Sequence, residues 1–422
     1  METVIKKTKF NFAKLFVIGL GFFGLSVLWS IYNTYVPLLL ANKFALDAAV
    51  IGFFMTLDNI AALFIQPIVG SWSDRMRSPL GRRLPFILIG APVAAIAFGL
   101  VPLASALPLF VACTVTTILA MAFWRTPVVA LMPDVTPSQY RSQANGIINF
   151  MGGVGVVAGT SIAATLVKTN PAAPFWFGSG LMLVAAALVL LFVREPKTHQ
   201  PVVSDIKPTL GRSFKELFSR ENRSGLGIFF AILFWFIAYN AIEAFLSLYG
   251  VNYLGLSESD AGRLITSVSF AFLIFAIPSG FLGAKIGRKK TILAGLAIMA
   301  AVLVAVYIGQ SQNITRVITK LPILGNFMPL SILLMLAGVG WSFININSLP
   351  MVVDQTDSSR VGTFTGLYYL FSTLAAILGP IINGFIIKLS GNDYGTIMIL
   401  GPIFFALAFV CMLTVRKGEA KV

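Results

Sequence analysis

Charged residues are scarce in this sequence, and histidine and cysteine are almost absent. Asp, Glu, Lys and Arg make up 11% of the 422 residues, which is less than half of the roughly 25% typical of soluble domains. The one histidine, His199, lies in a polar stretch away from the groups that a zinc site or a Ser-His-Asp set needs. Cys113 and Cys411 both fall in apolar runs, which indicates neither a disulfide framework nor a metal site. We therefore expect a protein that is not an enzyme and that has no metal and no cofactor.

Long apolar runs are abundant instead. Hydrophobic residues make up 57% of the chain, and the mean hydropathy is +0.87. A helix that crosses a bilayer needs about 20 apolar residues, and twelve runs meet this length. The first run is too long for a signal-peptide core and has no cleavage pattern behind it, so we expect it to be retained. The runs lie approximately at 13–40, 48–72, 84–103, 107–131, 141–168 and 174–194, then at 225–251, 260–284, 290–310, 328–350, 361–388 and 395–415.

Residues 195–224 form the one long polar segment between these runs. Three prolines make its first part a non-helical linker, and six runs lie on each side of it. The sequence therefore predicts an all-α membrane protein of twelve transmembrane helices. We expect an N-terminal six-helix bundle over residues 1–194, a cytoplasmic linker over 195–224, and a C-terminal six-helix bundle over 225–422.

The net charge of +15 follows the membrane topology. With the N-terminus inside, the inner segments hold 24 of the 31 Lys and Arg residues, the outer segments hold six, and Arg125 lies within a helix. Cytoplasmic loops carry such an excess of basic residues. We therefore expect a multi-pass protein of the plasma (inner) membrane with both termini in the cytoplasm, and no nucleic-acid partner.

Two basic loops in corresponding places indicate an internal duplication. Gly70–Pro85 (GSWSDRMRSPLGRRLP) lies between two apolar runs, and a shorter version follows at Gly280–Lys290 (GFLGAKIGRKK). The pair Tyr32-Asn33 recurs 207 residues later as Tyr239-Asn240. Repeats of this kind are typical of secondary transporters, which bind their substrate near mid-membrane between the repeats.

Four short segments around the first basic loop form a distinctive pattern. They are residues 66–70 (QPIVG), 73–75 (SDR), 81–83 (GRR) and 85–88 (PFIL), and a run from Pro127 to Asp134 follows. This pattern resembles the sucrose–proton symporters of the major facilitator superfamily and the related glycoside–pentoside–hexuronide cation symporters. The resemblance implies the major facilitator fold, with two pseudo-symmetric bundles that work by alternating access, in a bacterial member.

The chain departs from the plant sucrose carriers at one position of this pattern. Where those carriers have an arginine, this sequence has Val129, and its own arginine is Arg125, one turn earlier on the same helix face.

Three charged side chains fall within predicted spans away from their ends, and a charge near the bilayer centre costs about 2.5–3.5 kcal/mol and is usually functional. They are Asp58, Arg125 and Glu243. Asp58 and Arg125 form either a structural ion pair or a coupling device, in which a substrate that binds Arg125 releases Asp58 to take a proton. Glu243 shares a helix face with Tyr239 and Ser247, so it either lines a cavity or binds a neighbouring helix. These three residues are the candidates for proton coupling.

Neutral polar residues in the spans suit a sugar better than an anion, which would require several cations. Each asparagine has the alternative of bonding a neighbouring helix, but the set as a whole favours a polar cavity. Gln66 and Ala62 stand where melibiose-type carriers place paired acids, which argues against sodium coupling. The candidate substrate-binding residues are Tyr32, Asn33, Gln66, Arg125, Asn145, Asn149, Tyr239, Asn240, Glu243 and Asn345.

The basic loops and nearby acids are the candidates for a cytoplasmic gate. In the superfamily, the resemblance implies a latch of ion pairs and helix-end contacts that is closed when the carrier faces outward. Ala284 replaces the acid in the second copy, so we expect the latch of the C-terminal half to be weaker. The gate residues are Asp74, Arg75, Arg82, Arg83, Asp134, Arg141, Arg288, Asp354 and Arg360.

Together these features predict a proton-coupled symporter for a sugar, most plausibly a disaccharide or other glucoside. The partners are then a small-molecule substrate, protons and the lipid bilayer, and we expect a monomer. Two alternatives share the fold: a proton-coupled antiporter that exports a small hydrophobic compound, and a sodium-coupled sugar symporter. A membrane enzyme or a sugar sensor without net flux is a further class, and the enzyme lacks a nucleophile–base set.

Overall fold

The computed structural model describes residues 13–136, 141–195, 223–310, 313–355 and 361–416. Within them, twelve helical segments are long and apolar enough to cross a membrane, and each coincides with one predicted run to within a few residues. The predicted twelve-span helical membrane fold is therefore confirmed. The helices are α1 Ala13–Asn42, α2 Ala48–Phe54, α3 Leu57–Arg75, α4 Leu84–Leu100, α5 Leu107–Val135, α6 Arg141–Leu166, α7 Ala173–Phe192, α9 Arg223–Leu248, α10 Glu258–Ile286, α11 Arg288–Gly309, α12 Pro329–Val353, α13 Val361–Leu389 and α14 Ile397–Leu413.

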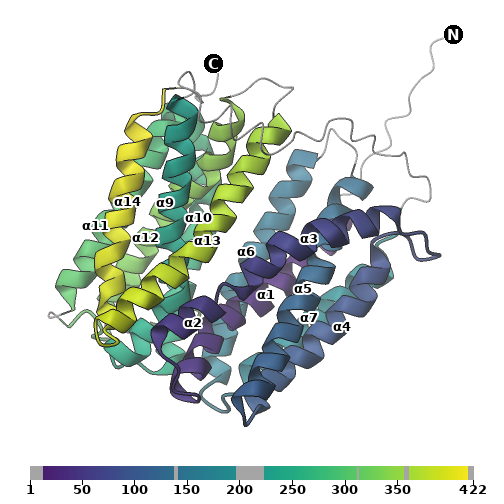
Figure 1. Ribbon diagram of the computed structural model, residues 1–422, viewed down its shortest axis with the longest axis horizontal. Helices are drawn as coiled ribbons and strands as arrows, with labels where there is room; N and C mark the ends of the chain where they lie inside the picture. Colours follow the sequence, from purple (N-terminus) through teal and green to yellow (C-terminus); the bar gives the residue numbers. More distant parts are fainter. Residues whose placement is uncertain (1–12, 137–140, 196–222, 311–312, 356–360, 417–422) are drawn as a thin grey trace.

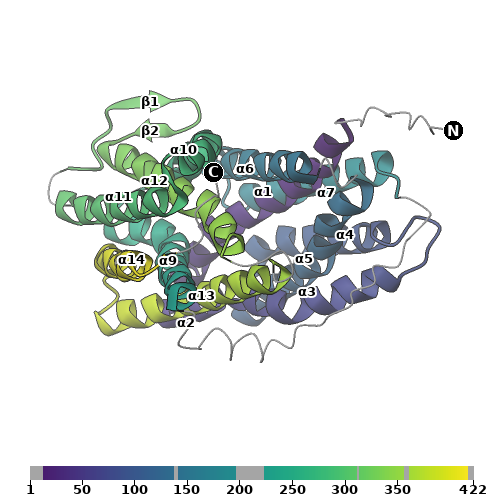
Figure 2. The same ribbon diagram turned by 90° about the horizontal axis from the view of Figure 1, so that it is seen from above.

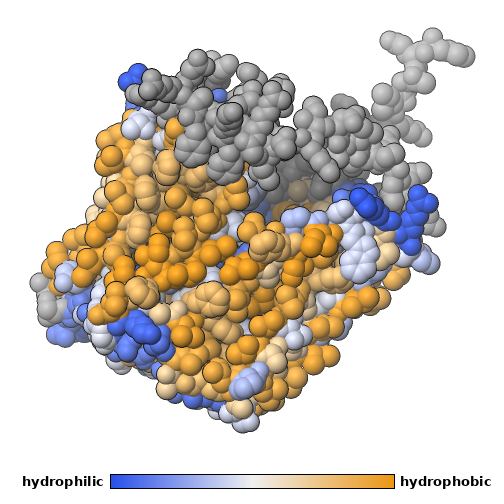
Figure 3. Space-filling view, viewed as in Figure 1, coloured by the Kyte–Doolittle hydropathy of each residue, from blue (hydrophilic) through white to orange (hydrophobic). Residues whose placement is uncertain are grey.

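The helices form two bundles that stand side by side (Figure 1). Helices α1 to α7 pack on one another, as do α9 to α14, and α1 also packs against α9 of the other bundle. The outer faces of both bundles expose many large apolar side chains, which form the orange surface in Figure 3. Such a surface suits hydrocarbon rather than water. Most of the predicted linker, 196–222, lies outside the described residues, so its boundaries remain a prediction.

The two halves touch near one end of the molecule and part toward the other. We call the end that holds Asp47 and Lys388 the closed end, and the end that holds both chain termini the open end (Figure 1). At the closed end, α2 packs on α13 and α6 packs on α10. The hydroxyl of Ser259 donates to the carbonyl of Ala164, and Thr266 bonds Thr160 at 2.8 Å. Between described residues, no hydrogen bond or ion pair joins the halves at the open end.

The second span is broken, which the sequence did not predict. Helix α2 ends at Phe54 and α3 begins at Leu57, so the predicted single helix over 48–72 is two helices. Thr56 occupies the junction, and its hydroxyl bonds the carbonyl of Phe53 at 2.7 Å. This side-chain bond competes with the helical pattern. The break places Asp58 in the first turn of α3, where the helix dipole favours a negative charge.

Two further elements lie at the closed end. A π-helical turn, Tyr249–Tyr253, extends α9. A two-stranded antiparallel hairpin, β1 Thr319–Leu321 and β2 Gly325–Phe327, connects α11 to α12. Figure 2 shows this hairpin beside α10 and α12, outside the outline of the helices. This hairpin lies between the predicted spans 290–310 and 328–350, where the sequence pattern predicts no element.

Candidate functional site

The two halves share a hydrogen bond in the interior of the membrane-spanning region. The side-chain amide of Asn33 in α1 donates to Oε1 of Glu243 in α9 at 3.3 Å. Each residue lies 20 positions after the first residue of its helix, which places both about 30 Å from the open end at 1.5 Å per residue. The structure therefore brings together two predicted site residues from opposite halves. Both side chains are half-buried.

Asp58 and Arg125 lie near this link without forming a direct ion pair. Their charges interact, and Asp58 also repels Glu243. The described residues show no Asp58–Arg125 contact within ion-pair distance. Instead, Asp58 Oδ1 accepts a 2.9 Å bond from the side-chain amide of Asn59. The predicted alternative of a closed structural pair is thus not the arrangement seen here.

The charge of Arg125 interacts with a residue of the other half of the protein. Arg125 lies within α5 and is exposed, and its charge interacts with Tyr369 of α13, which is 56% exposed. Arg125 and Tyr369 are therefore two exposed polar side chains that belong to opposite halves. In Figure 3 the surface is hollowed where the two halves part, and pale and blue side chains border the hollow.

Helix α1 carries polar atoms that have no partner although they are buried. Tyr32 and Tyr35 are 0% and 2% exposed, and neither hydroxyl has a hydrogen-bond partner; the same holds for the indole nitrogen of Trp29. The charge of Asp58 interacts electrostatically with the phenol of Tyr32. Buried donors without partners are costly. This face of α1 therefore offers unsatisfied hydrogen-bonding groups beside Asp58, Arg125 and Glu243, which we call the charged cluster.

An aromatic stack supports the C-terminal side of the cluster. The ring of Tyr239 lies 3.8 Å from that of Trp341 with an interplanar angle of 7°, and Phe236 packs edge-on against Trp341. Asn240 donates a 2.7 Å bond to the carbonyl of Phe236, one turn earlier in its own helix. Trp341 was missed in the sequence because one tryptophan in an apolar run carries no signal of its own.

The other predicted substrate residues are spread over three helices. Gln66 is half-buried on α3, Asn345 is half-buried on α12, and Asn149 is exposed on α6. Among the described residues, no hydrogen bond joins the side chain of Gln66 or Asn345 to Asp58, Arg125 or Glu243. The side chain of Asn145 lies outside the described part of the chain.

Four of the six gate residues predicted in the N-terminal half, Asp74, Arg82, Arg83 and Asp134, form one network at the open end. Arg82 Nε and Arg83 Nε both donate to Oδ2 of Asp134, at 3.2 and 2.9 Å, and a second nitrogen of Arg82 donates to Oδ1. Arg83 also binds Ser73 and Asp74, and it is 4% exposed. These bonds connect the end of α3, the start of α4 and the end of α5. All of them lie within one half.

Glu195 completes this network and was not predicted. Its carboxylate accepts bonds from the backbone N–H groups of Arg82, Arg83 and Leu84 at 2.8, 2.7 and 2.9 Å. These groups open α4, so Glu195 caps that helix from the end of α7. Gly81 has φ +111, and a Cβ there would meet the Glu195 carboxylate. Sequence reasoning assigned Glu195 to the linker, and only the fold brings it to the basic loop.

The C-terminal half repeats part of the network. Arg288 pairs with Asp354, and Lys289 donates to the carbonyls of Leu413 and Val415 at 2.9 and 2.6 Å. The start of α11 is thus tied to the end of α14, as the start of α4 is tied to the segment after α7. Arg75 is exposed. The side chain of Arg141 and all of Arg360 lie outside the described residues.

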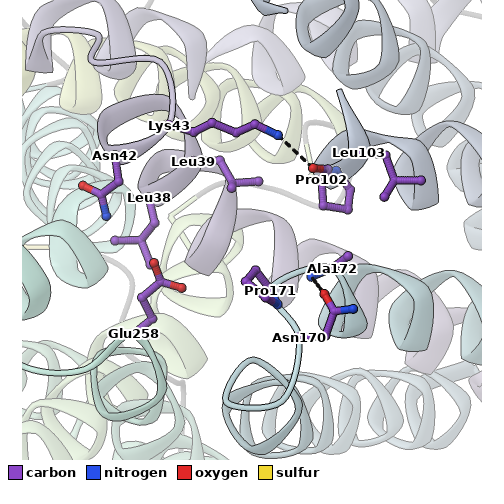
Figure 4. A pocket seen from close by; sticks show the side chains of 10 residues that line it. All are labelled: Leu38, Leu39, Asn42, Lys43, Pro102, Leu103, Asn170, Pro171, Ala172 and Glu258. Carbon is purple, nitrogen blue, oxygen red and sulfur yellow. Dashed lines mark hydrogen bonds between the residues drawn. The ribbon is translucent and has the colours of Figure 1, made fainter. Parts of the chain in front are cut away.

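The closed end has an ion pair and a surface pocket of its own. Lys388 of α13 bonds Asp47 at 3.0 Å across the halves, and Asp47 also caps α2 by accepting from Val50 N–H. The Val50 N–H and then Lys388 hold the pKa of Asp47 below its usual range. A pocket of about 460 Å³ lies at this end (Figure 4). There Lys43 bonds the carbonyl of Pro102, and Glu258 faces in from α10.

Comparison with known proteins agrees with this architecture. Residues 18–262 and 251–422 match the Major Facilitator Superfamily. Multidrug resistance protein 1 of Bacillus subtilis (strain 168) is 21% identical over 360 residues, covering 83% of this chain and 84% of that protein. The isoprimeverose transporter of Lactiplantibacillus pentosus is 23% identical over 309 residues, covering 70% and 64%. The crystal structure of the nucleoside transporter NupG superposes with a TM-score of 0.72 at 16% identity, covering 96% and 99%. The chain belongs to the Major Facilitator Superfamily, and it is a membrane transporter and not an enzyme.

Proposed function

We propose that this transporter couples the uptake of a sugar, such as a disaccharide or other glucoside, to the entry of protons. The observation that carries the proposal is the hydrogen bond between Asn33 and Glu243, which joins the halves beside Asp58 and Arg125. When the Glu243 carboxylate gains or loses a proton, the strength of the hydrogen bond that joins the two halves changes. Neutral amide and phenol groups around it suit the hydroxyls of a sugar.

The open end is the cytoplasmic end in this proposal. It holds Arg82, Arg83, Arg288 and Lys289, whereas the closed end holds few basic residues, and basic residues gather on the cytoplasmic side. The protein then lies in the plasma (inner) membrane in an inward-facing arrangement. The ion pairs within each half keep the ends of neighbouring helices together so that each half moves as a unit.

The coupling step uses the separation of Asp58 from Arg125. Without substrate, the arginine charge reaches Asp58 and favours its ionised form. A sugar hydroxyl that binds the guanidinium competes for this charge, and Asp58 then takes a proton more readily. Asp58 and Glu243 lie close enough for their charges to interact, and like charges disfavour each other. A change in the protonation of Asp58 therefore also acts on Glu243. Substrate and proton therefore favour each other's binding, which is what symport requires.

Uptake by purified protein in proteoliposomes tests this proposal. We would measure accumulation of labelled sucrose, maltose and isoprimeverose with and without an inward proton gradient, for wild type and Asp58→Asn. Glu258→Gln is the matched control, because it neutralises an acid of the closed end outside the cluster. Accumulation by wild type and the control, lost in Asp58→Asn, supports the proposal. Accumulation by Asp58→Asn equal to wild type removes Asp58 from the coupling path.

Export of a hydrophobic compound by proton antiport is the second candidate. It is favoured by the names of several relatives, including the tetracycline resistance protein, class E, of Escherichia coli. The same vesicles distinguish the two: the antiporter drives labelled tetracycline against its gradient when protons flow the other way and accumulates none of the sugars. This outcome would replace the sugar proposal.

A further inference from the structure

The β1–β2 hairpin and the residues before it form an exposed segment rich in large apolar side chains outside the membrane spans. All eight residues from Arg316 to Ile323 are exposed. Within this segment Val317, Ile318, Leu321 and Ile323 are 45%, 58%, 38% and 44% exposed. Clusters of large apolar side chains on a soluble surface are rare and mark an interaction site.

The hairpin is held firmly at its base, so this exposure is a property of the fold. Ile318 N–H bonds the carbonyl of Phe327 at 2.8 Å, and Leu330 N–H bonds the carbonyl of Ile314 at 3.0 Å. The side-chain amide of Asn326 donates to both oxygens of Asp260 at the start of α10, at 3.1 and 3.2 Å. The strands pair in a single register, with Lys320 opposite Asn326.

The position of the hairpin indicates what covers it. In Figure 2, which shows the molecule from above, β1 and β2 lie to the side of α10 and α12 and outside the helical outline. Helix α11 ends and α12 begins at the same level, and both carry exposed apolar side chains there, including Tyr307 and Ile332. Because the hairpin is displaced sideways from this level, the helices do not lie directly beneath it.

The charges of the segment complement a lipid headgroup region. Arg316 and Lys320 are exposed and flank the apolar side chains. Asp260, the acid that contacts the base of the hairpin, is bonded to Asn326 and to the hydroxyl of Ser257. Apolar side chains interleaved with basic ones form the pattern by which a segment lies in a membrane interface and binds anionic lipids.

We propose that the β1–β2 hairpin inserts Ile318 and its apolar neighbours into the adjacent membrane leaflet and binds the phosphates of anionic lipids through Arg316 and Lys320. The hairpin then fixes the closed end of the C-terminal half against the bilayer. This role is independent of which substrate the protein carries and of how transport is coupled.

A site-directed fluorescent label tests the insertion. Cys113 and Cys411 are replaced by alanine, and Ile318→Cys is labelled and reconstituted in phosphatidylcholine–phosphatidylglycerol vesicles. Asn42→Cys is the control, because Asn42 is exposed at the same end but lines the pocket of Figure 4. We expect nitroxide lipids to quench the label at 318 several-fold more than the label at 42, and aqueous iodide to do the reverse. Iodide quenching of 318 equal to that of 42 overturns the proposal, as does shielding from both quenchers, which indicates a protein partner or a second copy.

Charge neutralisation tests the phosphate contact. In Arg316→Gln/Lys320→Gln, labelled at 318, we expect the excess quenching by anionic over zwitterionic nitroxide lipid to disappear, since basic residues near the membrane surface attract anionic lipids. Arg263→Gln is the control, because that arginine lies beneath Gly325 and bonds Thr165. An undiminished preference for anionic lipid in the double variant contradicts the assigned role of the two basic residues.

Discussion

The side-chain amide of Asn33 in α1 donates a 3.3 Å hydrogen bond to the carboxylate of Glu243 in α9. A hydrogen bond to a charged group contributes about 1.5–3 kcal/mol, whereas one between neutral groups contributes about 0.5–1.5 kcal/mol. The contact between the halves is therefore stronger when Glu243 is ionised than when it is protonated. A change of protonation at this one carboxyl changes how firmly α1 and α9 hold together.

Replacing Glu243 by glutamine separates the two roles of this carboxylate. The amide oxygen of Gln still accepts from Asn33, but it cannot take or release a proton. We expect Glu243→Gln to exchange sugar across the membrane while losing accumulation driven by a proton gradient. Counterflow and gradient-driven uptake, measured on the same vesicles, check this.

Asn33→Leu is the complementary variant, because it removes the donor and leaves the acid. Its expected effect is slower counterflow. Wild-type accumulation by Glu243→Gln would mean that Glu243 holds the halves together without carrying the coupled proton.

The buried guanidinium of Arg83 is the centre of the network at the open end. It is 4% exposed and binds Ser73, Asp74 and Asp134. Removing one partner of a buried pair costs about 3–5 kcal/mol, because the other charge stays buried without compensation. We expect Arg83→Ala to lower the unfolding temperature of the purified protein clearly. Arg75→Ala, at an exposed neighbour, should change stability by no more than about 0.5 kcal/mol; equal losses in both variants would contradict this account.

Glu195 is expected to stabilise the protein as a cap. Glu195→Ala leaves the N–H groups of Arg82, Arg83 and Leu84 without their acceptor, and losing a cap costs about 0.5–2 kcal/mol. Thermal unfolding of Glu195→Ala against Arg194→Ala, its exposed neighbour, measures the effect. A variant as stable as the control would show that water replaces the carboxylate at no cost.

The charged part of the site was accessible from sequence because a charge within an apolar run is costly. Asp58, Arg125 and Glu243 stand out on that ground alone, and the fold gathers them. The bond between Asn33 and Glu243 was not accessible, because it depends on how two bundles are placed against each other. No pattern within either helix encodes that placement.

Other parts of the site were hidden for local reasons. Glu195 was hidden because its partners lie more than 110 residues earlier in the chain, at a helix start. The break between α2 and α3 was hidden because Thr56 lies in a continuous apolar run whose composition alone is compatible with one helix. The twelve spans were predictable because length and hydropathy suffice for them.

Asp74 tests whether the network also serves transport. Its side chain is largely exposed and binds Arg83 at the end of α3. We expect Asp74→Asn to slow transport at saturating substrate several-fold with little change in KM, since the residue lies far from the charged cluster and acts on the movement of the halves. Initial rates over a range of sugar concentrations give both quantities. A large rise in KM with an unchanged maximal rate would rule out a gate role.

The ion pair at the closed end predicts a dependence on pH. The pKa of Asp47 is held below its usual range by the Val50 N–H and then by Lys388, so its ionised form is the one that stabilises the fold. This contribution is complete above the ordinary aspartate pKa of about 3.9 and is lost as the pH falls through the lowered value. We expect the difference in unfolding temperature between wild type and Asp47→Asn to be constant above about pH 5 and to shrink below about pH 4. Because every other acid is common to the two proteins, their titration cancels in this difference, and a difference that stays constant down to pH 3 would show that Asp47 contributes nothing through its charge.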